Sequence, residues 1–287
     1  MAEGGPSGLL LVDKPAGITS HDAVDRVRKA LATRKVGHSG TLDPIATGLL
    51  LIGVGSATRL LRFLGELSKV YEGTGLLGMT TTTLDAEGEV LLERPVDITE
   101  ADLRSAMAVF VGEIEQVPPA YSAVKVAGER LYEAARAGRH VQAPARRVTV
   151  HSFELKSFDP PRFDFSVTCS SGTYVRSLVA DVGDRLGCGA HLAALRRTAI
   201  GPFDVAEAHP PDDPAPLLPV DAAVAHLPAM TLDVEEAKVA ARGSILGPAG
   251  IAGPYRALGP DGTLIGIYRD AGAKAVPDVI LPRVPSP

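Results

Sequence analysis

Short runs with the pattern of β-strands alternate along the chain with segments spaced like helices, and this order constrains the fold more than any other feature. The runs at 8–12 and 49–54 are apolar throughout and predict buried strands. The segments 147–158 and 163–169 alternate in strand fashion, whereas Val175 to Leu186 predicts a helix. Because strands are mixed with helices and include meander-like pairs, we expect an α+β fold.

The chain also divides into regions. A further strand is expected at 69–77. A helix is expected after Ser20, which is its predicted N-cap, and further helices are expected at 56–64, 99–111 and 131–137. Residues 210–219 are proline-rich and predict a linker or a wrapped surface segment. Short strands with Gly and Pro turns follow Leu227. We expect a large domain at 1–226, with an excursion at about 117–147, and a small β-rich domain at 227–287.

Composition bounds the class of protein. Of 287 residues, 45% are hydrophobic and 22% charged, which favours a well-buried core over disorder. No segment reaches about 18 uninterrupted apolar residues, so a membrane span is not expected. The first residues carry no basic stretch typical of a secretory signal. Cys169 and Cys188 lack zinc-ligand spacing, which indicates reduced core thiols and a cytoplasmic location.

The distribution of charge says more than its sum of −5. Residues 120–147 hold six Lys/Arg against two Asp/Glu, a net +4, and residues 21–72 hold eight against five, a net +3. Residues 81–119 hold two against nine, a net −7. If the basic segments converge in space, they form a positive face that can bind a phosphate backbone. Ordinary surface charge remains the alternative.

The stretch Gly37 to Gly48 contains three glycines and a proline without periodicity, and it predicts a loop. Glycines permit tight turns and close approach of a ligand, and Pro44 restricts the backbone of Asp43. A stiff loop before an apolar strand suits one presented carboxylate. An aspartate that merely closes a turn is the alternative for an isolated Asp-Pro pair.

Two other kinds of site are disfavoured. Gly73 to Gly78 matches a dinucleotide-binding glycine pattern, but threonines rather than a helix follow it. The seven histidines are scattered, with no metal-ligand spacing.

Six motifs set the Asp43 stretch in a wider context. They are Lys14-Pro-Ala-Gly-Ile-Thr-Ser20, Gly37-His-Ser-Gly-Thr-Leu-Asp-Pro-Ile-Ala-Thr-Gly48, Lys69-Val-Tyr71, Pro118-Pro-Ala-Tyr-Ser-Ala-Val-Lys125, Gly172-Thr-Tyr-Val-Arg176 and Leu195-Arg-Arg-Thr-Ala-Ile-Gly-Pro-Phe203. With these motifs in this order, the chain resembles the TruB family of tRNA pseudouridine synthases over about residues 8–203. The resemblance implies a mixed, mostly antiparallel central sheet flanked by helices, and a small PUA-like C-terminal domain that binds RNA.

The resemblance also implies the reaction. The family breaks the N1–C1′ bond of uridine-55 in the T arm of tRNA, rotates the uracil and rejoins it through C5. The product is an isomer, so no cofactor or metal is expected. The target base must be flipped out of the RNA loop first. Attack of a carboxylate on C1′, a glycal route and addition to C6 remain open as chemical routes.

By resemblance, Asp43 is the catalytic aspartate, Arg176 pairs with it, and Tyr71 packs on the uracil face and is a candidate proton acceptor. An adjacent guanidinium favours the ionised carboxylate and orients it. His38 matches the histidine that enters the RNA loop, and Tyr174 is expected to line the same pocket.

Four cations are candidates for phosphate contacts, which give salt-dependent affinity. They are Lys14, Lys125, Arg146 and Arg147. The expected partner is tRNA, with no membrane and no obligatory protein partner, and the chain is expected to be a monomer. A non-catalytic RNA-binding or RNA-folding protein and a guide-RNA-dependent relative remain as alternatives.

Overall fold

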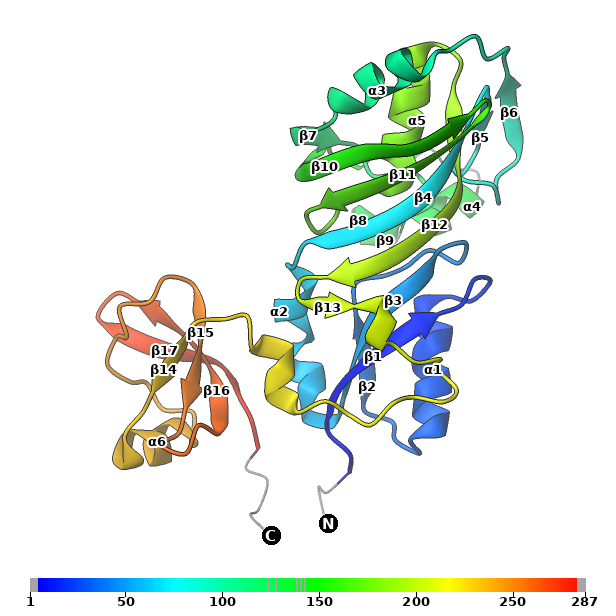
Figure 1. The fold of residues 1–287 in the computed structure, drawn as a ribbon. Coiled ribbons are helices and arrows are strands. Elements are labelled where there is room, and N and C mark those ends of the chain that lie inside the picture. The colour runs from blue at the N-terminus through cyan, green and yellow to red at the C-terminus, as the bar shows by residue number, and fades with distance from the viewer. Residues whose placement is uncertain are drawn as a thin grey trace.

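The computed structural model describes residues 5–122, 124–126, 128–137, 139, 141 and 143–282. A large body is built on a nine-stranded sheet and a small body on a four-stranded one (Figure 1). The large sheet has the order β1-β3-β12-β4-β11-β10-β7, with β2 beside β3 and β13 beside β12. Its strands are β1 (Gly8–Lys14), β2 (Val36–Ser39), β3 (Thr47–Val54), β4 (Lys69–Leu77), β7 (Gly112–Gln116), β10 (Arg146–Asp159), β11 (Arg162–Cys169), β12 (Ala190–Ile200) and β13 (Phe203–Asp204). The only parallel pairing among them is between β3 and β12, so the expected α+β fold with a mostly antiparallel sheet is confirmed.

The apolar strands β1 and β3 are covered on both faces. Leu10 and Ile52 pack against helix α1 (Ser20–Ala30). Leu9 and Leu51 point the other way, into a cluster with the short helices η1 (Gly55–Leu60) and α2 (Leu61–Gly65). Successive side chains on a strand face opposite sides, so a strand with helices on both sides is apolar at every position.

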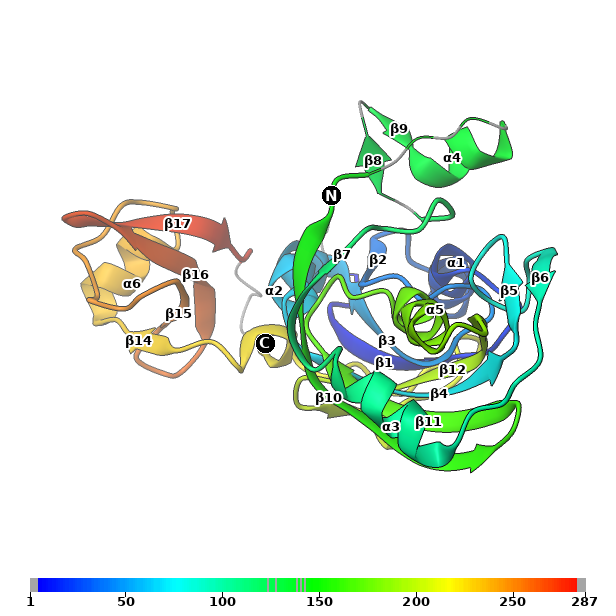
Figure 2. The same cartoon turned by 90° about the horizontal axis from the view of Figure 1, so that it is seen from above.

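The other half of the sheet is covered by α3 (Glu100–Ala108) and α5 (Val175–Leu186). Thr99 and Asp102 form the capping box expected at the start of α3. Gly187, with φ of +79°, ends α5 in the left-handed conformation. Figure 2 shows α5 on the concave side of the curved sheet.

Three local predictions differ from the structure. Residues 36–39 form strand β2, not part of a loop, because they pair with β3 and this pairing outweighs the low strand preference of glycine. Thr19, not Ser20, is the N-cap of α1, because its hydroxyl accepts from the backbone N–H of Asp22. The helix expected at 99–111 ends at Ala108.

The excursion contains two short strands and a helix, β8 (Lys125–Val126), β9 (Glu129–Arg130) and α4 (Leu131–Arg136). It stands away from the sheet on the same side as α5 (Figure 2). A separate hairpin of β5 (Met79–Thr81) and β6 (Val90–Glu93) follows β4.

The proline-rich segment leads to the small body along β1. Leu218 and His209 form isolated bridges to Leu9 and Val12, so the segment is wrapped against the large body. The small sheet has the order β14-β15-β16-β17. Its elements, with the short helices before it, are η2 (Val205–Glu207), η3 (Val220–Val224), β14 (Ala229–Thr231), α6 (Val234–Ala240), β15 (Pro254–Leu258), β16 (Leu264–Ala271) and β17 (Lys274–Ile280).

The two bodies share a contact. Ile267 and Val279 of the small sheet belong to the same apolar cluster as η1, α2 and η3. Arg62 of α2 donates to the backbone carbonyl of Asp278 at 3.1 Å. Within the described residues, no helix is long and apolar enough to cross a membrane.

Candidate active site

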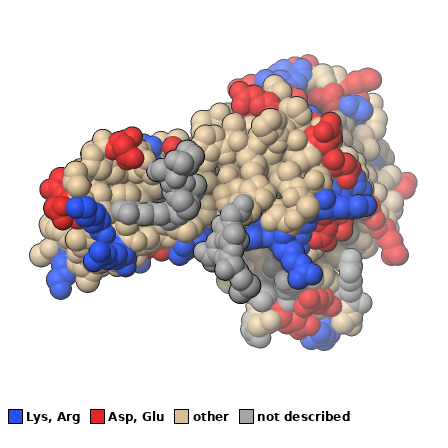
Figure 3. All heavy atoms as spheres, turned by 90° about the horizontal axis from the view of Figure 1, so that it is seen from below, with Lys and Arg blue, Asp and Glu red and all other residues tan. Residues whose placement is uncertain are grey.

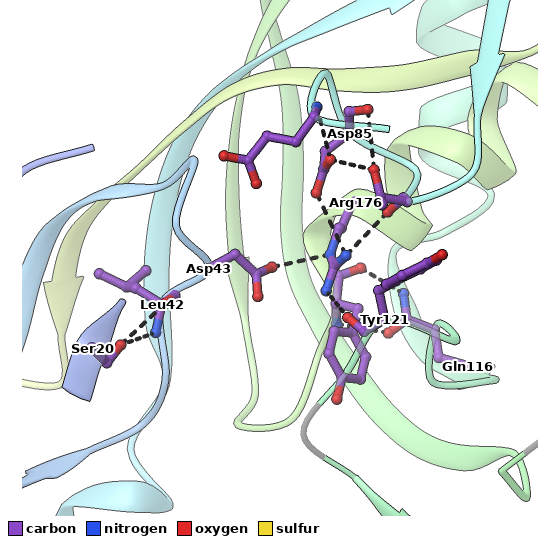
Figure 4. A network of polar contacts seen from close by, with 10 residues as sticks. Ser20, Leu42, Asp43, Asp85, Gln116, Tyr121 and Arg176 are labelled. Carbon is purple, nitrogen blue, oxygen red and sulfur yellow. Dashed lines mark hydrogen bonds and ion pairs between the residues drawn. The ribbon is translucent and has the colours of Figure 1, made fainter. Parts of the chain in front are cut away.

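The loop between β2 and β3 carries Asp43 and is fixed from behind. The Ser20 hydroxyl accepts from the backbone N–H of Leu42 at 2.8 Å and donates to its carbonyl at 3.1 Å. The backbone N–H of Gly17 donates to the carbonyl of Pro44 at 2.9 Å. Both residues that flank Asp43 are therefore tied to the chain at the start of α1, which fixes the backbone of Asp43. Figure 4 shows the bonds between Ser20 and Leu42.

Lys14 contributes to the same arrangement. Its side chain is fully buried, and its ammonium donates to the carbonyls of Pro15 and Ile18 at 2.8 Å, with that of Pro44 at 3.5 Å. Burial lowers its pKa to about 8. In the free protein the ammonium is thus occupied by carbonyls, and a contact of Lys14 with a phosphate stays a prediction.

Arg176, in the first turn of α5, lies against Asp43. Its Nε is 3.0 Å from Oδ2 of the carboxylate. The side chain of Arg176 is 5% exposed and that of Asp43 is 37% exposed. The carboxylate is therefore paired on one side and open on the other, as a group that meets a substrate must be.

The rest of the Arg176 guanidinium is held by the segment after β5 and by the first residues of the excursion. It donates to the carbonyls of Thr83 at 3.0 Å and of Tyr121 at 2.8 Å, and its Nη1 lies 3.5 Å from Oδ2 of Asp85. Asp85 is 4% exposed and accepts from the hydroxyl of Thr83 and the backbone N–H of Glu87. Figure 4 shows the two carboxylates on different sides of the guanidinium.

The sequence did not single out Asp85 as a site residue, because its partner Arg176 is 91 residues away in the chain. The charge of one guanidinium is thus shared by two carboxylates, which leaves Asp43 less than fully neutralised.

The electrostatics of Asp43 follow from these neighbours. Burial raises the pKa of its carboxyl above the ordinary value, and the charge of Arg176 opposes this rise. Asp85 raises the pKa further, whereas Lys14 lowers it. The ionised form of Asp43 therefore depends on Arg176, the largest of the influences that favour it.

Tyr71 lies on β4 and is 7% exposed. It belongs to the same apolar cluster as Leu42 and Ala46 of the Asp43 loop, so the loop packs beside it. Burial raises the pKa of the phenol, and Arg197 on the neighbouring strand lowers it. The hydroxyl is therefore protonated at neutral pH in the free protein.

Arg146 and Tyr174 form one unit beside α5. The guanidinium of Arg146 lies 4.6 Å from the centroid of the Tyr174 ring and donates to the carbonyl of Gly172. The amide of Gln116 bonds both backbone groups of Tyr174, at 2.9 and 3.1 Å. This fixes a half-exposed arginine on an aromatic face, a combination that can contact phosphates and bases.

The other residues predicted to contact RNA do not form a unit with Arg146 and Tyr174. Arg147 is exposed on β10, and His38 is half-buried on β2, where burial lowers the pKa of its imidazole. The side chain of Lys125 lies outside the described residues. In the part of the chain that is described, no three histidine, cysteine, aspartate or glutamate side chains come together as metal ligands.

Three successive parts of the chain match models of the domains of pseudouridylate synthases. The TruB family pseudouridylate synthase N-terminal domain matches residues 28–175. The tRNA pseudouridylate synthase B C-terminal domain matches residues 176–213, and the tRNA pseudouridine synthase II C-terminal domain matches residues 227–282.

Relatives and solved structures agree with this match. A protein from Thermobifida fusca (strain YX) named tRNA pseudouridine synthase B is 48% identical over 286 residues, which cover 95% of this chain and 98% of the relative. A Mycobacterium protein (strain KMS) of the same name is 45% identical and is covered to 96%, as is this chain. A chain in the crystal structure of a Cbf5-Nop10-Gar1 complex is 26% identical with a TM-score of 0.75, covering 96% of this chain and 85% of that one.

Proposed function

The chain belongs to the TruB family of pseudouridylate synthases, which are isomerases, and from this membership we propose that it converts uridine-55 in the T arm of tRNA to pseudouridine. The observation that carries the proposal is the carboxylate of Asp43, paired with a buried guanidinium and open on its other side. A protein that only binds RNA gains nothing from a carboxylate directed towards a polyanion.

The reaction needs no net input of electrons or groups. The N1–C1′ bond breaks, C1′ joins C5 of the rotated uracil, and the proton on C5 is lost while N1 gains one. Attack of Asp43 on C1′, removal of a sugar proton on the way to a glycal, and addition to C6 all use the ionised carboxylate as nucleophile or base. Arg176 favours that ionised form and fixes the direction of the carboxylate.

Tyr71 has a role next to the carboxylate. In the TruB family the ring at this position packs on the uracil, and the protonated hydroxyl of Tyr71 is a hydrogen-bond donor before it can accept a proton. The loop of Asp43 packs against this ring, so a base that stacks on Tyr71 places its sugar near Asp43.

The RNA is held by groups around the site. The Arg146–Tyr174 pair and exposed Arg147 lie at the start of β10 and α5, beside the excursion. His38, neutral because burial lowers its pKa, can stack in the space that the flipped nucleotide leaves. On the face of the molecule seen in Figure 3, basic side chains form separate groups with acidic ones between them, so phosphates meet local patches and not a uniformly positive surface.

The proposal includes action without a protein partner, as a monomer. The relatives at 48% and 45% identity are covered to 98% and 96% of their length by this chain and are named tRNA pseudouridine synthase B, whereas the chain from the Cbf5-Nop10-Gar1 complex is more distant at 26%. Purified protein and a T-arm transcript with tritium at C5 of the uridine test this directly. Release of tritium by the protein alone supports the proposal. Binding of the transcript without release would point to an RNA-binding protein, and release only with added guide RNA to the guide-dependent class.

A further inference from the structure

A second arginine, Arg197, is buried next to the proposed active site without an acidic partner. It lies on β12 and is 1% exposed. Within the described residues, no carboxylate is within ion-pair distance of its guanidinium. Burial of an unpaired charge is costly, so its hydrogen bonds must compensate for the lost hydration.

The hydrogen bonds of Arg197 go to the two ends of the loop that carries Asp43. Its Nε donates to the carbonyl of Leu49 at 2.7 Å, and its Nη2 donates to that of Gly40 at 3.3 Å. Gly40 follows strand β2, and Leu49 lies at the start of β3. One planar guanidinium therefore bridges both ends of the segment that presents the carboxylate.

The backbone of Arg197 adds a contact at the same place. Arg197 pairs in parallel with Gly48, which has φ of +101°. A Cβ on Gly48 would lie 2.3 Å from the carbonyl oxygen of Arg197. The close approach of β12 to the end of the loop thus requires glycine at this position.

Arg197 also contacts the strand that carries Tyr71. The two residues are opposite each other on β12 and β4, and the guanidinium carbon is 6.0 Å from the centroid of the phenol ring. Lys69, two residues before Tyr71, is buried beside the same loop and donates to the carbonyls of Gly65 and Leu67. The buried guanidinium of Arg197 thus connects the loop of Asp43 to the strand of Tyr71.

We propose that Arg197 is a positioning residue that sets the place of Asp43 relative to Tyr71, through the carbonyls of Gly40 and Leu49. It touches no substrate, and its effect passes through the loop. The inference rests on the proposed function, since it assigns Arg197 to the geometry of that reaction. A displacement of about 1 Å at a reacting group can reduce a rate about 100-fold, so a modest opening of the loop is enough to matter.

Arg197→Met and Arg197→Lys test the proposal, with Arg196→Met as the matched control. Arg196 is the neighbouring arginine on the opposite face, 41% exposed and paired with Asp13. It donates to the hydroxyl of Thr47 at 3.4 Å but makes no bond to the carbonyls of Gly40 and Leu49, so it lacks the bridge under test. We expect Arg197→Met to lower the single-turnover rate of pseudouridine formation about 100-fold while its Kd for the T-arm transcript stays within about twofold. Lysine keeps the charge but lacks the fork, so Arg197→Lys recovers only part of the rate.

A second measurement does not need activity. Amide hydrogen exchange over residues 41–46 of the free protein is expected to be faster in both Arg197 variants and unchanged in Arg196→Met. If Arg197→Met does not fold, Arg197→Lys carries the test. A wild-type rate and wild-type loop exchange in a folded Arg197 variant, or full recovery by lysine, would overturn the positioning role. Failure of the wild-type protein to release tritium would instead refute the proposed function. Hydrogen exchange in the Arg197 variants would still show whether Arg197 holds the loop in place.

Discussion

Replacement of Arg176 by methionine removes the guanidinium that contacts both Asp43 and Asp85. Asp85 is almost completely buried and loses its counter-charge, and breaking a buried ion pair typically costs about 3–5 kcal/mol. The partly exposed Asp43 adds little to this cost, because solvent screens it. At about 2–4 °C per kcal/mol for a large domain, the loss corresponds to a fall in Tm of roughly 6–20 °C.

The same change has a defined effect on the pH dependence of activity. Burial already raises the pKa of Asp43, and Arg176 lowers it, so removal of Arg176 raises the pKa further. The reaction needs the ionised carboxylate, and the acid limb of the rate profile must therefore move to higher pH in Arg176→Met. Single-turnover tritium release between about pH 5 and 9, at a temperature well below the Tm, measures the shift.

Two variants control this measurement. Arg176→Lys keeps a positive charge, so its acid limb is expected to move less than that of Arg176→Met. Arg185→Met changes an arginine in the last turn of the same helix, away from the site, and is expected to leave the profile unchanged. An acid limb that stays in place in Arg176→Met, or moves to lower pH, would refute the dependence of Asp43 on Arg176.

Three further changes have expected outcomes. Lys69→Met tests a buried cation. Burial lowers the pKa of Lys69 in the folded protein from the ordinary 10.5 to about 8. Between these two pH values the unfolded state therefore binds more protons than the folded state, and the free energy of unfolding rises with pH. Urea unfolding across this window should show that slope in the wild type and a reduced slope in the variant. Arg146→Ala is expected to weaken RNA binding and to lower the slope of log Kd against log salt by about one, because the guanidinium that lies on Tyr174 no longer contacts a phosphate. An unchanged slope would show that Arg146 is not part of the RNA interface. Ser20→Ala leaves both backbone groups of Leu42 without their partner, and we expect a loss of about 1–3 kcal/mol in urea unfolding together with a slower single turnover; stability equal to the wild type would contradict the role of this hydroxyl.

Elements with a regular pattern were predictable from the sequence. Strand β4 and helix α5 have the expected bounds, and the capping box at Thr99 marks the start of α3. Strand β2 was not predictable as a strand, because its glycine and histidine favour a loop and only the pairing with β3 makes it a strand. Local composition cannot report a partner that lies further along the chain.

The residues of the candidate site also differ in how well the sequence predicts them. The pairing of Asp43 with Arg176 was predictable because each lies in a motif of its own, whereas the contact of Asp85 with Arg176 becomes visible only in the fold. Lys14 was assigned to the surface from its residue type, and the structure places it in the interior against carbonyls. Residue type alone cannot distinguish a lysine that binds phosphate from one that supports a loop.

The dependence of the chemistry on Asp43 is tested most directly by Asp43→Asn with the tritiated T-arm transcript. Asparagine keeps the shape of the side chain but cannot attack C1′ or remove a proton. We expect the variant to bind the transcript with an affinity close to that of the wild type and to release no tritium in a single turnover. Release at the wild-type rate would contradict the assignment of Asp43 as the catalytic group.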